Sequence, residues 1–77
     1  MIEYTATFYS HFGALSYYKA LKEHSISAEL MPVPRSISAS CGTCVHYMHN
    51  EFFDFDECEI EAVYAKANGH FVCVFRK

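Results

Sequence analysis

The chain has 77 residues, 52% of them hydrophobic and 17% aromatic, and this composition predicts a single folded domain over residues 1–77. Its net charge is −3 and its six Lys and Arg residues are scattered, which argues against a nucleic-acid-binding protein. No apolar run approaches the ~20 residues of a membrane span. The N-terminus enters a strand without a visible secretory signal, so we expect a cytoplasmic protein that does not bind membranes.

Apolar and polar residues alternate over residues 2–9, which predicts a first strand. Ser10 is a suitable N-cap for a helix that runs to about His24. The spacing of its apolar residues predicts one buried helix face: Ala14, Leu15, Tyr18 and Leu21. Residues 25–33 and 44–48 are predicted to form the second and third strands, joined by a long loop.

A second helix is predicted from residue 56 to residue 67. Asp56 and Glu59 fit a capping box, and Phe55 with Ile60 fits a hydrophobic staple. The apolar residues that follow have the spacing of one helical face: Ile60, Val63, Tyr64 and Ala67. Gly69 would close this helix in a left-handed conformation, and residues 71–75 would form the last strand.

The predicted order is strand, helix, strand, strand, helix, strand. This order is typical of an α+β, ferredoxin-like fold, in which a four-stranded antiparallel sheet carries both helices on one face. The sequence assigns this core to residues near Tyr4 and to Leu15, Tyr18, Leu21, Ile60, Val63 and Tyr64.

The loop between the second and third strands carries the best candidate for chemistry. Pro34 disfavours a helix at this point, and Gly42 permits a tight turn beside Cys41. A thiol reacts as the thiolate, which nearby cations and backbone amides stabilise. We therefore predict that Cys41 is the reactive thiol and that Arg35, in the same loop, favours its ionised form.

Cys44 completes a Cys-x-x-Cys spacing and is open to several interpretations. It could form a disulfide with Cys41, act as its resolving thiol, or simply begin the third strand. Cys41, Cys44, His46 and His49 also suggest zinc, but four ligands crowded on a short strand cannot close a tetrahedron. We therefore predict no metal and no cofactor.

The remaining candidates are given structural roles. Cys58 and Cys73 are predicted to be hidden by packing inside a helix and a strand. His11, His24 and His70 lie near element ends and are expected to be solvated.

The loop sequence, Pro32-Val-Pro-Arg followed by Ile37-Ser38-x-Ser40-Cys41-Gly42, resembles the signature of a small family of selenium/sulfur (Se/S) carrier-like proteins, found mainly in bacteria. The resemblance implies a ferredoxin-like fold and a cysteine that carries sulfur or selenium. The positions that it carries over are Pro34, Arg35, Ile37, Ser38, Ser40, Cys41 and Gly42. It departs at Ala39, where serine is more usual, and at Ser25, where glycine is expected after the helix.

These features predict a carrier and not a stand-alone enzyme. Cys41 would accept a persulfide or selenide from a partner such as a cysteine desulfurase. A protein- or metal-binding regulatory module and a thiol–disulfide redox protein that uses Cys41 and Cys44 remain alternatives. The aromatic content also leaves open a homodimer interface.

Overall fold

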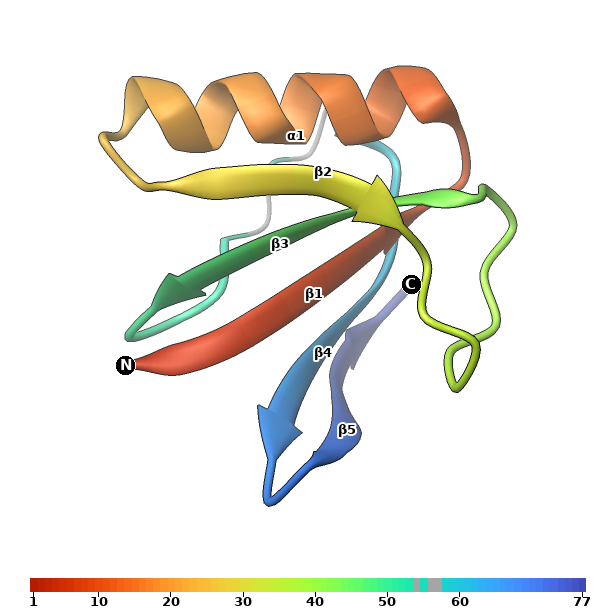
Figure 1. Cartoon of the computed structure of the whole chain (residues 1–77). Helices are drawn as coiled ribbons and strands as arrows, with labels where there is room; N and C mark the ends of the chain where they lie inside the picture. The colour runs from red at the N-terminus through yellow and green to blue at the C-terminus, as the bar shows by residue number, and fades with distance from the viewer. Residues whose placement is uncertain (54, 56–57) are drawn as a thin grey trace.

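The computed structural model describes residues 1–53, 55 and 58–77. These residues form one helix and five strands, in the order β1 (Ile2–Phe8), α1 (His11–Glu23), β2 (Ala28–Pro32), β3 (Thr43–His49), β4 (Ile60–Ala67) and β5 (His70–Arg76). All neighbouring strands are antiparallel, and their order across the sheet is β2-β3-β1-β4-β5 (Figure 1). None of the described helical residues forms a segment long and apolar enough to cross a membrane.

The predicted α+β class and antiparallel sheet are confirmed, but the predicted ferredoxin-like arrangement is wrong in its second half. The first strand, the first helix and the next two strands lie close to their predicted positions. The Ser10 side chain caps α1 by accepting a hydrogen bond from the Gly13 N–H at 3.1 Å. The helix then lies across one face of the sheet (Figure 1).

The buried face of α1 keeps the predicted Ala14 and Leu21 but contains Tyr17 in place of Leu15 and Tyr18. Tyr17 is fully buried, whereas Leu15 and Tyr18 are half-buried. The Tyr17 hydroxyl donates to the Phe53 carbonyl at 2.7 Å and lies 2.8 Å from the Tyr47 hydroxyl. These partners make burial of a tyrosine hydroxyl favourable, because a buried polar group without a hydrogen bond is destabilising.

Residues 60–67, predicted as a helix, form β4. Ile60 and Val63 face the α1 side of the sheet, and Ala62 and Tyr64 are buried on the other side. A strand that is buried on both faces does not alternate cleanly between apolar and polar residues. In β4 the apolar residues also have the spacing of one helical face, which is why the sequence pattern predicted a helix.

The turn after β4 is Asn68-Gly69, with positive φ angles of 52° and 79°. Two such residues between paired strands make a type I′ hairpin, so Gly69 joins two strands and does not end a helix. The predicted cap at Asp56 lies outside the described residues.

An aromatic segment packs on the sheet face that also carries α1. The Phe52 ring lies 5.3 Å from that of Phe75 and 6.3 Å from that of Tyr4, and the Phe55 ring lies 5.4 Å from that of Tyr17. This segment therefore joins α1 in covering the main core. Most of the predicted core residues are indeed buried: Tyr4, Leu21, Ile60, Val63 and Tyr64.

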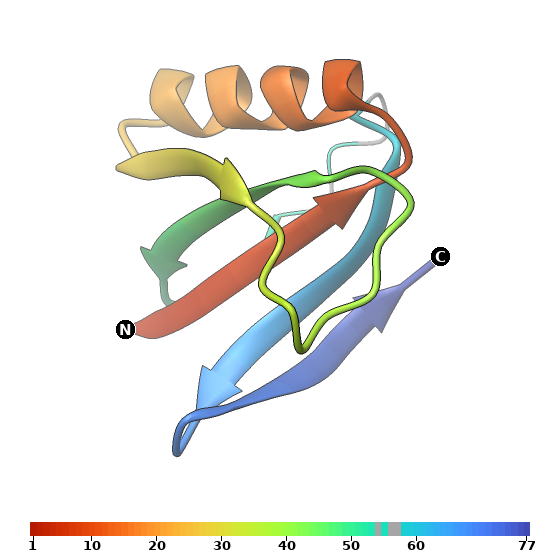
Figure 2. The same cartoon turned by 45° about the vertical axis from the view of Figure 1, so that its right-hand side comes forward.

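The opposite face of the sheet carries no helix among the described residues. The loop of residues 33–42 crosses this face in front of β1 toward β4 (Figure 2). Ile37, only 7% exposed, packs there with Ala62 and Tyr64. The loop is therefore part of a second, smaller core.

Substitution of Gly13 by alanine tests how closely α1 approaches the segment before β4. A Cβ atom at Gly13 would lie 2.3 Å from the Cys58 carbonyl oxygen. This overlap outweighs the ~1 kcal/mol that alanine adds to helix stability, so we expect Gly13→Ala to lower the free energy of unfolding by at least about 1 kcal/mol in urea denaturation. Gly42→Ala is the matched control, because nothing lies within 4 Å of a Cβ atom there. A denaturation midpoint for Gly13→Ala equal to that of the wild type would contradict the contact.

Substitution of Ser25 by glycine tests the end of α1. Ser25 has a positive φ of 61°, and the Ile26 N–H donates to the Leu21 carbonyl at 2.9 Å, as in a Schellman motif. This conformation explains why glycine suits the position, and we expect Ser25→Gly to raise the free energy of unfolding by up to about 1 kcal/mol. Ser27→Gly, at a position without a positive φ, should lower it slightly. An equal response of both variants would show that the left-handed conformation carries no strain.

Candidate functional site

The loop of residues 33–42 is anchored to β4 through Glu61. Thr7 pairs with Ala62 and Phe8 pairs with Ile60, so Glu61 is an extra, unpaired residue that forms a β-bulge. One oxygen of its carboxylate accepts the Ser40 N–H and the other accepts the Ser40 hydroxyl, both at 2.9 Å. Bulges often redirect a side chain next to a functional site. In this protein the redirected carboxylate fixes the residue that precedes Cys41.

Cys41 is half-buried, and its sulfur faces a backbone amide. The Thr43 N–H donates to Cys41 Sγ at 3.5 Å. This contact fixes the Cys41 sulfur beside the first residue of β3.

His11 supports this arrangement from the start of α1. Its Nδ1 lies 3.2 Å from the Thr43 hydroxyl, which links α1 to the first residue of β3. Figure 1 shows the start of β3 beside the connection between β1 and α1. His11 is exposed as expected, but its contact with Thr43 was not predicted, because nothing in the sequence pattern relates the two positions.

The base of the loop is closed by backbone hydrogen bonds. The Ile37 N–H donates to the Pro34 carbonyl at 3.0 Å, and the Val33 N–H donates to the Gly42 carbonyl at 3.1 Å. Both acceptors are backbone carbonyls. Gly42 has no positive φ and nothing lies within 4 Å of a Cβ atom there, so the expectation that this turn needs a glycine is wrong.

Two of the predicted site residues point away from any described partner. Arg35 and Ser38 are exposed, and neither makes a hydrogen bond or ion pair within the described part of the chain. The loop geometry therefore depends on Ser40, while the influence of Arg35 on Cys41 stays a prediction.

The other cysteines differ sharply in their surroundings, and no disulfide joins any of the four. Cys44 is fully buried, its thiol donates to the Pro32 carbonyl at 3.6 Å, and burial raises the pKa of Cys44 to about 11. Cys58 is buried, as predicted. The expectation that packing hides Cys73 is wrong: Cys73 lies on β5, at the edge of the sheet, and is exposed.

The two histidines that follow Cys41 in the sequence, His46 and His49, contact other residues. His46 Nε2 lies 2.8 Å from a Glu3 carboxylate oxygen, while the His49 ring packs 5.0 Å from that of Phe53. Across residues 1–53, 55 and 58–77, no group of three or more His, Cys, Asp or Glu side chains is placed to hold a metal ion.

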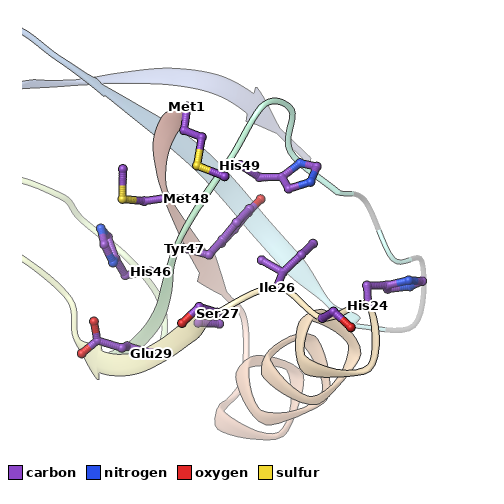
Figure 3. A pocket seen from close by; sticks show the side chains of 11 residues that line it. Met1, His24, Ile26, Ser27, Glu29, His46, Tyr47, Met48 and His49 are labelled. Atoms are coloured by element: carbon purple, nitrogen blue, oxygen red, sulfur yellow. The ribbon is translucent and has the colours of Figure 1, made fainter.

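A cleft of ≈ 480 Å³ lies between the turn after α1 and the end of β3 (Figure 3). Ile26, His46, Met48 and His49 are among the residues that line it. Neither Cys41 nor any other residue of the loop of residues 33–42 lines this cleft, which takes its β3 residues from His46 onward. The cleft is therefore not part of the Cys41 site.

Comparison with known families gives one match. A family model described as "Putative Se/S carrier protein-like" matches residues 3–70. The same comparisons found no significant match among curated proteins or solved structures. The matched range contains the whole loop of residues 33–42 and its anchor Glu61.

Alkylation of the folded protein tests the surroundings of the four thiols. We expect iodoacetamide to label Cys41 and Cys73, and to leave Cys44 and Cys58 largely unmodified. At pH 8 a thiol with a pKa of about 11 is ionised in only about one molecule in a thousand, and burial also blocks the reagent at Cys44. Peptide mass spectrometry measures the rate at each site, and labelling in denaturant, where all four should react, is the control. Modification of folded Cys44 as fast as Cys41 would contradict the structure.

Proposed function

Because the chain belongs to the Se/S carrier protein-like family, we propose that it carries a sulfur or selenium atom on Cys41. The observation that supports this most is the presentation of the thiol, half-buried in an anchored loop with a backbone N–H 3.5 Å from its sulfur. A carrier has to expose its thiol to donor and acceptor proteins in turn. A thiol on a surface loop meets that need better than one in an enclosed cavity.

Loading would proceed by attack of the Cys41 thiolate on the terminal sulfur of a persulfide on the donor. The donor's S–S bond breaks, a new S–S bond forms on Cys41, and the donor cysteine leaves as a thiolate. A terminal selenium atom would move in the same way. Unloading repeats the exchange with a nucleophile of the acceptor, which returns Cys41 to the thiolate without net oxidation or reduction.

The Thr43 amide has the same part in loading and in unloading. It lies 3.5 Å from Cys41 Sγ, the atom that attacks as a thiolate in the first step and leaves as a thiolate in the second. His11 holds the Thr43 side chain, and Glu61 holds Ser40, so the chain is fixed on both sides of Cys41. Fixing these neighbours preserves the amide geometry between loading and unloading.

The redox alternative is less well supported. Cycling between a dithiol and a disulfide needs both Cys41 and Cys44 to be accessible. Cys44 is fully buried and its pKa is raised by burial, so it would have to be uncovered before it could react.

Intact mass spectrometry after incubation with a cysteine desulfurase and cysteine tests the proposal. We expect a mass gain of one sulfur atom that is located on Cys41 and released by a reducing thiol. Cys41→Ser should abolish the gain, and Cys73→Ser, which removes the exposed thiol of β5, should keep it. A gain that survives Cys41→Ser, or no gain in the wild-type protein with an active desulfurase, would rule out this role for Cys41.

A further inference from the structure

Besides the bulge at Glu61 in β4, the sheet has a second β-bulge, which lies in β5. Cys73 and Arg76 are three residues apart, and in a regular strand they would point to opposite faces. However, Tyr64 pairs with Cys73 and Val63 pairs with Phe75, which leaves Val74 as an extra residue in the strand. The bulge at Val74 shifts the alternation by one residue.

The shift brings three functional side chains to one face. Arg76 pairs with Ala62, and Ala62 shares a face with Tyr64, the partner of Cys73. One Arg76 guanidinium nitrogen, Nη2, donates to the Tyr64 hydroxyl at 2.9 Å. The Cys73 thiol donates to the Phe75 carbonyl at 3.4 Å and is exposed. Cys73, Tyr64 and Arg76 therefore form a cluster on the face that the loop of residues 33–42 also covers.

The cluster combines an exposed thiol with an exposed cation. The hydrogen bond to Tyr64, with a smaller contribution from Cys73, raises the pKa of Arg76, which agrees with the proximity of the three side chains. Arg76 has five N–H donors and is exposed, so donors remain that can pair with a carboxylate.

We propose that Cys73, Arg76 and Tyr64 form a second thiol site, which reacts with anionic low-molecular-weight disulfides such as oxidised glutathione. Arg76 would bind a carboxylate of the disulfide and bring its S–S bond to Cys73. This reaction goes beyond the proposed carrier function and does not involve Cys41.

The step is a thiol–disulfide exchange. The Cys73 thiolate attacks one sulfur of the disulfide, whose S–S bond breaks as a new S–S bond forms on the protein. The other half leaves as a thiolate and takes up a proton from water. The incoming disulfide supplies the oxidising equivalent, so no further oxidant is required.

The test compares an anionic with a neutral disulfide. Wild-type protein is incubated with oxidised glutathione or with bis(2-hydroxyethyl) disulfide, and peptide mass spectrometry gives the rate of adduct formation at Cys73 for each. We expect Arg76→Gln to lower the ratio of the two rates by about two- to fivefold, as expected for an exposed charged contact. Arg76→Lys, which keeps the charge, should retain most of the ratio. Cys73→Ser should abolish the adduct and Cys41→Ser should preserve it.

The outcomes separate this site from the carrier site. An adduct on Cys41 in place of Cys73, or an unchanged rate ratio in Arg76→Gln, would overturn the proposal. If Arg76→Gln does not fold, the wild-type protein is tested at increasing salt concentration. Salt screens charged contacts, so the ratio of the glutathione rate to the neutral-disulfide rate should fall if Arg76 binds the carboxylate. A ratio that salt leaves unchanged would contradict the contact. Sulfur loading by a desulfurase is measured in Cys73→Ser, so either site can fail without affecting the test of the other.

Discussion

Within the described part of the chain, α1 lies on one face of the sheet only, and the loop of residues 33–42 covers part of the other face. Ala62 and Thr7 are almost completely buried on that second face, and Ile37 comes from the loop to pack against Ala62. Full burial of an isoleucine side chain contributes about 1.5–3 kcal/mol, a large share of the stability of a small domain. The loop that carries Cys41 is therefore part of the folded core, and the position of its thiol follows from core packing.

Two β-bulges determine which side chains surround Cys41 and Cys73. The bulge at Glu61 sends a carboxylate to Ser40, which fixes the chain beside Cys41. The bulge at Val74 brings Arg76 onto the face that holds Cys73. The two bulges lie in β4 and β5, the paired strands of one hairpin. Of these two strands, β5 is at the edge of the described sheet, and an edge strand tolerates an extra residue more easily because it has one fewer partner to match.

The sequence predicted β1, α1, β2, β3, the cysteine loop and the family, because clear alternation, an N-cap and a specific motif mark them. It failed at β4, where burial on two faces produced helical spacing, although the Asn68-Gly69 turn was a readable hairpin signal. The contacts His11–Thr43 and Glu61–Ser40 could not have been predicted in the same way. They join residues that are far apart in the sequence, and they depend on strand register and on a bulge that no local pattern encodes.

Tyr64 connects the two proposed thiol sites through different parts of one side chain. It packs with Ile37 in the second core, and its hydroxyl accepts the hydrogen bond from Arg76. A movement of the loop that displaces Ile37 would therefore also disturb the residue that orients Arg76 toward Cys73. Conversely, an adduct on Cys73 would add bulk beside Tyr64 and hence near the tip of the loop. The shared residue gives the two sites a physical route for influence on each other, even though each uses its own cysteine and its own bulge.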